Sequence, residues 1–216
     1  MAKVTLWTRQ DERFLEAMQK EGVFHTKREY IEEKNQELTP YFIKLYDWFV
    51  AEASKRVPRP DGALYPIWCS VNSEYMLRGA HGNILIKLSV DEERIIYFDS
   101  PKWDLVINHY YIAKDYDDRM KFENELKNRG ITNSFALLDE HHRKFYPDLV
   151  QKVMNSWARI FDVDRNSENI FEVQANIWEI FPEDIVEIRE GEEEKIIRGS
   201  KWVQLFQNLK PLKNES

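Results

Sequence analysis

The pattern of apolar and polar residues changes most clearly between Ile84 and Tyr111. Two short apolar runs, ILIKLSV and IIYFDS, are separated by the charged residues DEER and followed by a proline. This sequence pattern is typical of two strands joined by a turn. Ser100 and Pro101 then predict a helix start, because serine caps helices and proline suits the first helical position. We therefore expect a central pair of strands, followed by a helix.

Helical spacing of apolar side chains predicts further helices on both sides of this stretch. Asp11 suits the start of the first helix, and Gly22 suits its end. A ring-rich helix begins at Thr39, and a second apolar face repeats at i, i+3, i+4 and i+7 after Pro147. We expect helices at 12–22, 39–53, 101–111, 115–129 and 147–161, and a loop at the start of the charged segment 26–38.

Shorter apolar runs predict the remaining strands. They lie at 4–8, 63–70, 170–179 and 185–188, and Pro66 makes the second an edge or bulged strand. The mixture predicts an α+β fold with small mixed or antiparallel sheets flanked by helices. A length of 216 residues fits a single domain spanning 1–216. We expect residues 210–216 to form a frayed tail.

Composition narrows the classes of function. The formal net charge is -7, so the chain lacks the overall basic field of a general nucleic-acid binder. Cys69 is the only cysteine, which excludes an internal disulfide and a cysteine-based zinc site and fits a reducing compartment. No apolar run approaches the ~18 residues of a membrane span. These features predict a cytoplasmic protein without a membrane partner.

Short motifs with a known mechanism are absent from the chain. There is no GxGxxG after a strand, no GxxxxGK[ST], no HExxH and no GxSxG. No group of histidines and acids has metal-ligand spacing, so we expect no metal site. The residues alone therefore leave open whether the chain is an enzyme.

Three short segments carry a resemblance to a family. The chain resembles uncharacterised bacterial and phage proteins that open with Leu-Trp-Thr-x-Gln, here Leu6-Trp7-Thr8 with Gln10. The same proteins carry Tyr-Pro-x-Trp, here residues 65–68, and Gln-Ala-x-x-Trp-Glu, here residues 174–179. That resemblance spans most of the chain and implies no activity.

The order of these segments is also distantly similar to that of ADP-ribosyltransferases. Those proteins bind NAD in a cleft between two small sheets, and a glutamate on a late strand precedes a Pro-containing segment and an Ile-rich strand. The resemblance implies an NAD-binding domain, possible transfer to a nucleic-acid or protein acceptor, and a phage or defence setting. It implies cofactor-binding roles for Trp7, Thr8, Gln10, Tyr65 and Trp68, and catalytic roles for Gln174, Glu172 and Glu179.

Two departures from that pattern leave alternatives open. Trp7 replaces a polar ribose-binding group, and Gln174 stands where a carboxylate would stabilise positive charge on the ribose. Either Glu172 or Glu179 supplies that charge, or the chain keeps a nucleotide cleft without transfer. The other reading is a non-enzymatic module whose aromatic cleft binds a protein or nucleic-acid partner. The oligomeric state is not predicted.

Overall fold

The computed structural model describes residues 2–74, 76–132, 134–139, 143–164, 172–190 and 195–197. These form two compact units, one from the described parts of 1–97 and 174–216, the other from 98–173. The first holds most of the sheet and the second is mainly helical. The prediction of a single domain stays a prediction, and the predicted tail at 210–216 lies outside the described residues.

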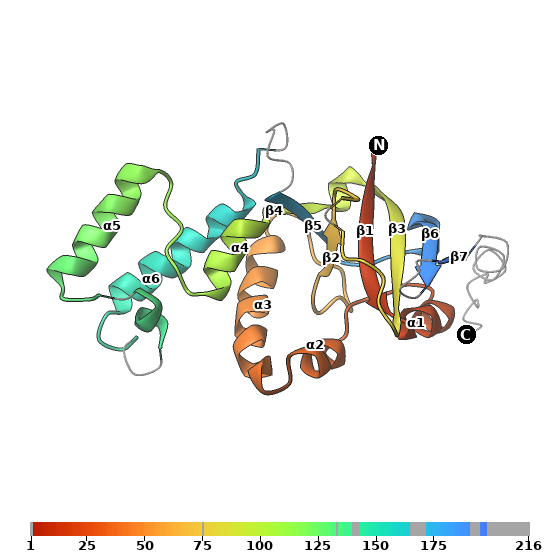
Figure 1. Cartoon of the computed structure of the whole chain (residues 1–216), viewed down its shortest axis with the longest axis horizontal. Coiled ribbons are helices and arrows are strands. Elements are labelled where there is room, and N and C mark those ends of the chain that lie inside the picture. The colour runs from red at the N-terminus through yellow and green to blue at the C-terminus, as the bar shows by residue number, and fades with distance from the viewer. Residues whose placement is uncertain are drawn as a thin grey trace. The chain divides into compact units, whose positions relative to one another are not determined.

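One seven-stranded sheet runs in the order β4-β5-β2-β1-β3-β6-β7 (Figure 1). Every pairing for which a register is defined is antiparallel. With helices flanking these strands, the predicted α+β class is confirmed. The strands are β1 (Lys3–Asp11), β2 (Ile67–Ser70), β3 (Asn83–Asp91), β4 (Ile96–Asp99), β5 (Val173–Ile177), β6 (Ile185–Glu190) and β7 (Lys195–Ile197).

The prediction that the two central strands pair with each other is wrong. Both strands form, but β3 pairs with β1 and β6, whereas β4 lies at the opposite edge of the sheet beside β5. The charged residues between them form a short 3-10 helix, Glu92–Arg94, instead of a hairpin turn. Long-range partners with matching apolar faces therefore decide the pairing.

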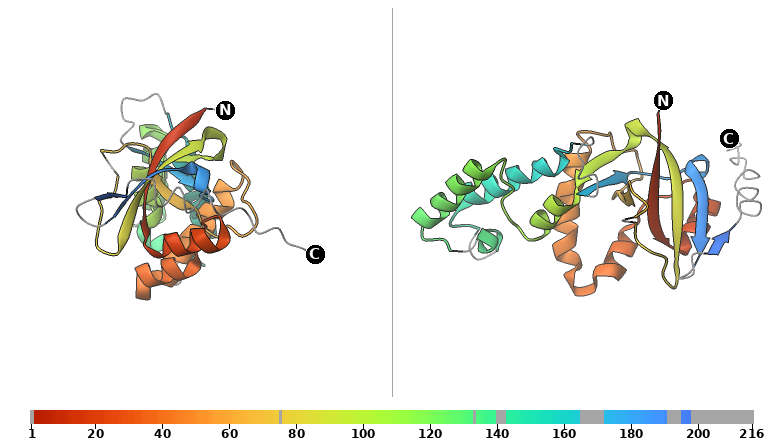
Figure 2. Two further views of the ribbon diagram at one scale, coloured as in Figure 1. Left: turned by 90° about the vertical axis from the view of Figure 1, so that its right-hand side faces the viewer. Right: turned by 45° about the horizontal axis from the view of Figure 1, so that its top comes forward.

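Three helices belong to the sheet unit: α1 (Arg13–Glu21), α2 (Arg28–Asn35) and α3 (Thr39–Ala53). Gly22 closes α1 with a φ of 70°, as predicted. The expected loop at the start of 26–38 is wrong, because α2 forms there and meets α3 at a sharp corner (Figure 2). Its single buried residue, Ile31, explains why the apolar pattern did not indicate it.

One hydrophobic core of the sheet unit lies on the face of the sheet that α1 covers, whereas Phe49 of α3 packs against Trp68 on the other face. Phe14 and Met18 of α1 pack in this core with alternate residues of five strands. The strand residues of this core are Leu6, Ile67, Cys69, Ile84, Ile86, Leu88, Val90, Ala175, Ile177 and Ile188. Alternation then places the residues between them on the other face.

The helical unit contains α4 (Ser100–Ile107), α5 (Tyr116–Asn128) and α6 (Pro147–Ser156), the last continued by the 3-10 helix Trp157–Phe161. α5 and α6 lie side by side (Figures 1 and 2). Asp99, and not Ser100 as predicted, caps α4, because its side chain accepts a hydrogen bond from the Lys102 amide at 2.9 Å.

Candidate functional site

A row of five directly paired residues crosses the sheet from β5 to β6. Gln174 pairs with Ser70, Ser70 with Trp7, Trp7 with Lys87, and Lys87 with Glu187. All five side chains are partly exposed. Since neighbouring strands lie about 4.8 Å apart, Trp7 and Gln174 are separated by roughly 10 Å. The segment that contains Trp7 and the segment that contains Gln174 are thus brought near each other, with β2 between them.

This row lies on the sheet face opposite the core. Leu6 and Leu88, which flank Trp7 and Lys87, belong to the core, and so do Cys69 and Ala175 beside Ser70 and Gln174. Successive strand residues point to opposite faces. The row therefore points away from α1, and its five side chains are a ring, a hydroxyl, an amide, an ammonium and a carboxylate.

Two polar side chains of the row have no hydrogen-bond partner among the described residues. These are the side-chain amide of Gln174 and the ammonium of Lys87. Two residues along β5 from Gln174, on the same face, Asn176 is 0% exposed, and its Oδ1 accepts no hydrogen bond within the described residues. Its Nδ2 donates to the Ile67 carbonyl at 3.3 Å. A buried unpaired acceptor is uncommon and favours a water or ligand donor at this face.

Two predicted stacking residues, Tyr65 just before β2 and Trp68 within it, contact residues of α3. Trp68 lies against Phe49 and Tyr46 of α3, with ring centroids 5.2 and 5.9 Å apart. Tyr65 is 7% exposed and donates its hydroxyl to Asp47 at 3.1 Å. Burial, together with that carboxylate, raises the pKa of Tyr65, so the phenol stays protonated. Both side chains contact α3. Trp7 is therefore the partly exposed aromatic side chain of the row.

Thr8 and Gln10 lie on the core face, opposite Trp7. The Thr8 hydroxyl is buried and donates to the Trp68 carbonyl at 2.8 Å, and Gln10 Nε2 donates to Thr8 Oγ1 at 2.7 Å. Gln10 also lines a cavity of about 410 Å³ at the end of β1, together with Arg13 and Tyr30. Arg13 there is already paired with Asp11 and Glu33. The structure therefore separates these two predicted residues from the row.

The two predicted glutamates lie in different surroundings. Glu179 lies beyond the end of β5, where its carboxylate is 3.2 Å from His25 Nε2 and its carbonyl accepts a hydrogen bond from Arg94. It follows Gln174 by five residues, and the bend at Trp178 lies between the end of β5 and Glu179. Glu172 immediately precedes β5 and is exposed. Of the predicted catalytic residues, the structure brings Gln174 into the row.

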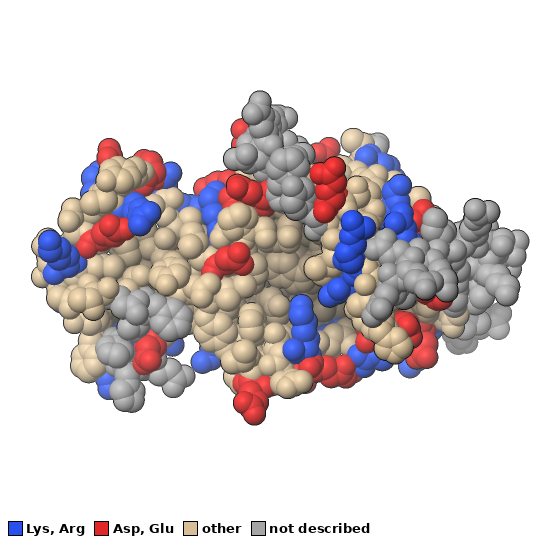
Figure 3. Space-filling model, in the orientation of Figure 1, with Lys and Arg blue, Asp and Glu red and all other residues tan. Residues whose placement is uncertain are grey.

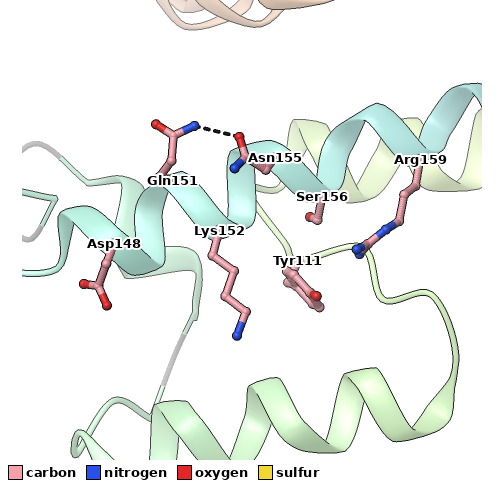
Figure 4. Close-up of a pocket in the computed structure, with 7 residues that line it drawn as sticks. All are labelled: Tyr111, Asp148, Gln151, Lys152, Asn155, Ser156 and Arg159. Atoms are coloured by element: carbon pink, nitrogen blue, oxygen red, sulfur yellow. Dashed lines mark hydrogen bonds between the residues drawn. The ribbon is translucent and has the colours of Figure 1, made fainter.

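A second cavity, of about 420 Å³, lies in the helical unit between α5 and α6 (Figure 4). Lys152, Tyr111 and Arg159 point into it, whereas Gln151 and Asn155 point away and hydrogen-bond each other. Its charges have partners: Lys152 binds Glu125 of α5, and Arg159 donates to the Ile112 carbonyl and lies 3.5 Å from Asp118. Asp148 likewise binds Arg129. We interpret this cavity as part of the packing between the two helices and not as a binding site.

Ser70 and Lys87 were missed by sequence reasoning. Both lie in the row, but neither belongs to a motif, and Lys87 interrupts an apolar run in the ordinary way of a strand. Only the strand order, which brings residues 7, 70, 87 and 174 together, reveals them. Their polar character is visible in the sequence, but their position beside Trp7 is not.

Across the described ranges no three histidine, cysteine, aspartate or glutamate side chains lie where they could share a metal ion. In the same part of the chain no helix combines the length and apolarity that crossing a membrane requires. Lys and Arg side chains gather over the region where Figure 1 draws β1, β2 and β3 (Figure 3).

The comparisons with known proteins identify a family without an activity. No curated protein matches the chain, and no solved structure matches it. A family model described as "Domain of unknown function (DUF3841)" matches residues 5–186. This range includes four of the five residues of the row, and Glu187 lies just beyond it. The chain therefore belongs to the DUF3841 family.

Proposed function

We propose that this chain binds NAD, or a closely related nucleotide, on the sheet face that carries Trp7, Ser70 and Gln174. The observation that supports the proposal is the direct pairing of these residues across β1, β2 and β5. The chain order of strand, helix, middle strand and late strand followed by a Pro-containing segment is the order that suggested an ADP-ribosyltransferase-like domain. The structure adds adjacency in space to that order.

The chemistry of the row suits a nucleotide. The Trp7 ring is partly exposed and offers a stacking surface, which suits nicotinamide or adenine. Ser70 and Gln174, on the next two strands, offer a hydroxyl and an amide, which are groups that hydrogen-bond a ribose.

Transfer of ADP-ribose would need more than the row supplies. When the bond between nicotinamide and ribose breaks, positive charge develops on the ribose, and a fixed carboxylate stabilises it best. Gln174 offers a dipole without charge, so Glu172, two residues earlier, is the carboxylate we propose for that role. If it does not act, the chain binds the nucleotide without transfer to a protein or nucleic-acid acceptor.

The alternative is an interaction module that uses an aromatic cleft. The packing of Trp68 and Tyr65 against α3 removes two of the rings on which that reading depends. Trp7 alone is a small surface for a macromolecular partner, because interface energy concentrates in clusters of buried aromatic and arginine side chains. The nucleotide reading therefore has the better support.

Thermal unfolding with and without NAD tests the proposal. A ligand present at ~100 times its dissociation constant adds about 2.7 kcal/mol to the free energy of unfolding. We expect NAD to raise the melting temperature of the natural chain and of the control Gln19→Ala, an exposed glutamine on α1, but not of Gln174→Ala. No shift in the natural chain, or an equal shift in Gln174→Ala, would contradict the proposal.

Release of nicotinamide separates binding from transfer. If Glu172 stabilises the ribose cation, the natural chain releases nicotinamide from NAD, and Glu172→Gln slows the release while the NAD-dependent thermal shift remains. A bound nucleotide without any release of nicotinamide would leave binding as the function and remove the catalytic role of Glu172.

A further inference from the structure

Three cations surround Leu85 on the same sheet face as Trp7. Arg9 and Arg189 each pair directly with Leu85 across the neighbouring strands, and Lys87 lies two residues further along β3. Residues two apart on a strand share a face, so all three cations point to the side that carries Trp7. Diagonal neighbours of this kind have Cα atoms about 7–8 Å apart, within reach of one anionic group.

Among the described residues, two of these cations have no carboxylate partner. Arg189 binds Glu187. Arg9 Nη1 donates to the Arg78 carbonyl at 3.1 Å, which satisfies one donor but not the charge. Lys87 forms neither an ion pair nor a hydrogen bond with the described residues, although Glu187 is directly opposite. Asp11, the other carboxylate near Arg9 on this face, binds Arg13.

Lys87 lies at an irregular point of the sheet, and its side chain is partly buried. The pairing of β3 with β6 shifts register between Lys87 and Leu88. Irregularities of this kind change the direction of nearby side chains and are common beside functional sites.

We propose that Lys87 and Arg9 bind a phosphate group of the nucleotide, so that the ligand is a phosphorylated one whose ring end lies at Trp7. This inference rests on the proposed function and adds the group that holds the charged part of the ligand. Lys87 pairs directly with Trp7, and Arg9 lies two residues from Trp7 on the same face. Both cations are therefore near a phosphate of a nucleotide whose ring covers Trp7.

Calorimetric titration with matched ligands tests the assignment. The ligands are NAD, ADP-ribose, nicotinamide riboside, which lacks phosphate, and a single-stranded oligonucleotide. The variants are Lys87→Met, Lys87→Arg and the control Lys20→Met, an exposed lysine on α1, the helix that covers the opposite face. Circular dichroism and the melting temperature of each variant confirm that it folds.

We expect Lys87→Met to weaken NAD and ADP-ribose roughly tenfold to a hundredfold, as for a lost hydrogen bond to a charged group. Nicotinamide riboside should bind the variant as it binds the natural chain, and Lys20→Met should change nothing. Lys87→Arg should keep most of the affinity. The salt dependence of ADP-ribose binding should fall in Lys87→Met, because one cation is gone.

The contrary results fall into distinct groups. If the natural chain binds NAD and Lys87→Met binds it equally well, the phosphate assignment is wrong and the proposed function stands. An equal loss for nicotinamide riboside would make Lys87 a structural residue and overturn the assignment. If no nucleotide binds the natural chain, both proposals fail. If the oligonucleotide is the only ligand that binds, and its binding depends on Lys87, the ligand of this face is a nucleic acid and not a nucleotide, which overturns the assignment.

Discussion

At the scale of single residues, one buried ion pair holds the segment that follows β5. Asp184 is 1% exposed, and it accepts hydrogen bonds from Arg94 Nη1 and Nη2 at 2.7 and 2.9 Å and from the Phe181 amide at 2.9 Å. Burial is the largest single effect and would lower the pKa of Arg94, but the hydrogen bonds to Asp184 together with the attraction of nearby carboxylates, that of Asp184 first, raise the pKa. The pair fixes the turn between β5 and β6.

Asp184→Ala should therefore be strongly destabilising. Removing one partner of a buried pair leaves the other charge uncompensated and costs about 3–5 kcal/mol. The matched control is Glu33→Ala, which breaks the exposed pair with Arg13 and should cost less than about 1 kcal/mol. Urea unfolding measures both. Similar losses for the two variants would show that burial of the pair is not decisive.

Cys69 gives a second prediction at this scale. Burial raises the pKa of the thiol to about 12, and the side chain is 4% exposed. Between the pKa of an unfolded cysteine, about 8.5, and that value, the unfolded chain releases a proton that the folded chain keeps, so stability falls as pH rises. Iodoacetamide at pH 8.5 should label the folded chain far more slowly than the urea-unfolded chain. Equal rates would contradict the burial of Cys69.

The site could be predicted only in part from individual residues. Trp7 and Gln174 were expected from the resemblance and lie in one row, whereas Thr8 and Gln10, adjacent in sequence, point to the opposite face. The period of a strand separates them, and the exact register needed to see this is not encoded locally. Ser70 and Lys87 enter the row only through pairing with distant strands.

At the scale of elements, the residues of a segment predicted those features that depend on the segment itself, such as the bounds of a helix. The spacing after Thr39 gave α3 its observed bounds, and Gly22 gave α1 its end. α2 was missed because it buries one side chain, and the expected β3–β4 hairpin was wrong because each strand finds better partners far along the chain. Strand existence follows from the sequence pattern, but strand order does not.

The contact between β1 and β2 gives a prediction at this scale. Their ladder aligns a single pair, Trp7 with Ser70, and the hydrogen bond from Thr8 Oγ1 to the Trp68 carbonyl extends it. Thr8→Val keeps the shape but removes this donor in a buried place, at a cost of about 1–3 kcal/mol. Thr5→Val, at an exposed position of β1, is the control and should be nearly neutral. Chemical denaturation compares them, and equal stability would show that the hydroxyl does not hold the strands.

At the scale of the whole molecule, the helical unit 98–173 interrupts the chain between β4 and β5. The row of the candidate site therefore combines residue 7, residue 70 and, after the helical unit, residue 174. Such long-range pairing carries a high entropic cost before it is rewarded, which favours slow folding. It also explains why composition and periodicity predicted the α+β class while the assembled site stayed hidden.

The most direct test of the central claim is a nitrogen-edited NMR titration of the full chain with NAD. The account predicts that the largest amide shifts fall on Trp7, Ser70 and Gln174, with further shifts at Lys87. These residues should respond together at one dissociation constant. Shifts confined to the cavity between α5 and α6, or no shifts at all at saturating NAD, would contradict the assignment of nucleotide binding to this face of the sheet.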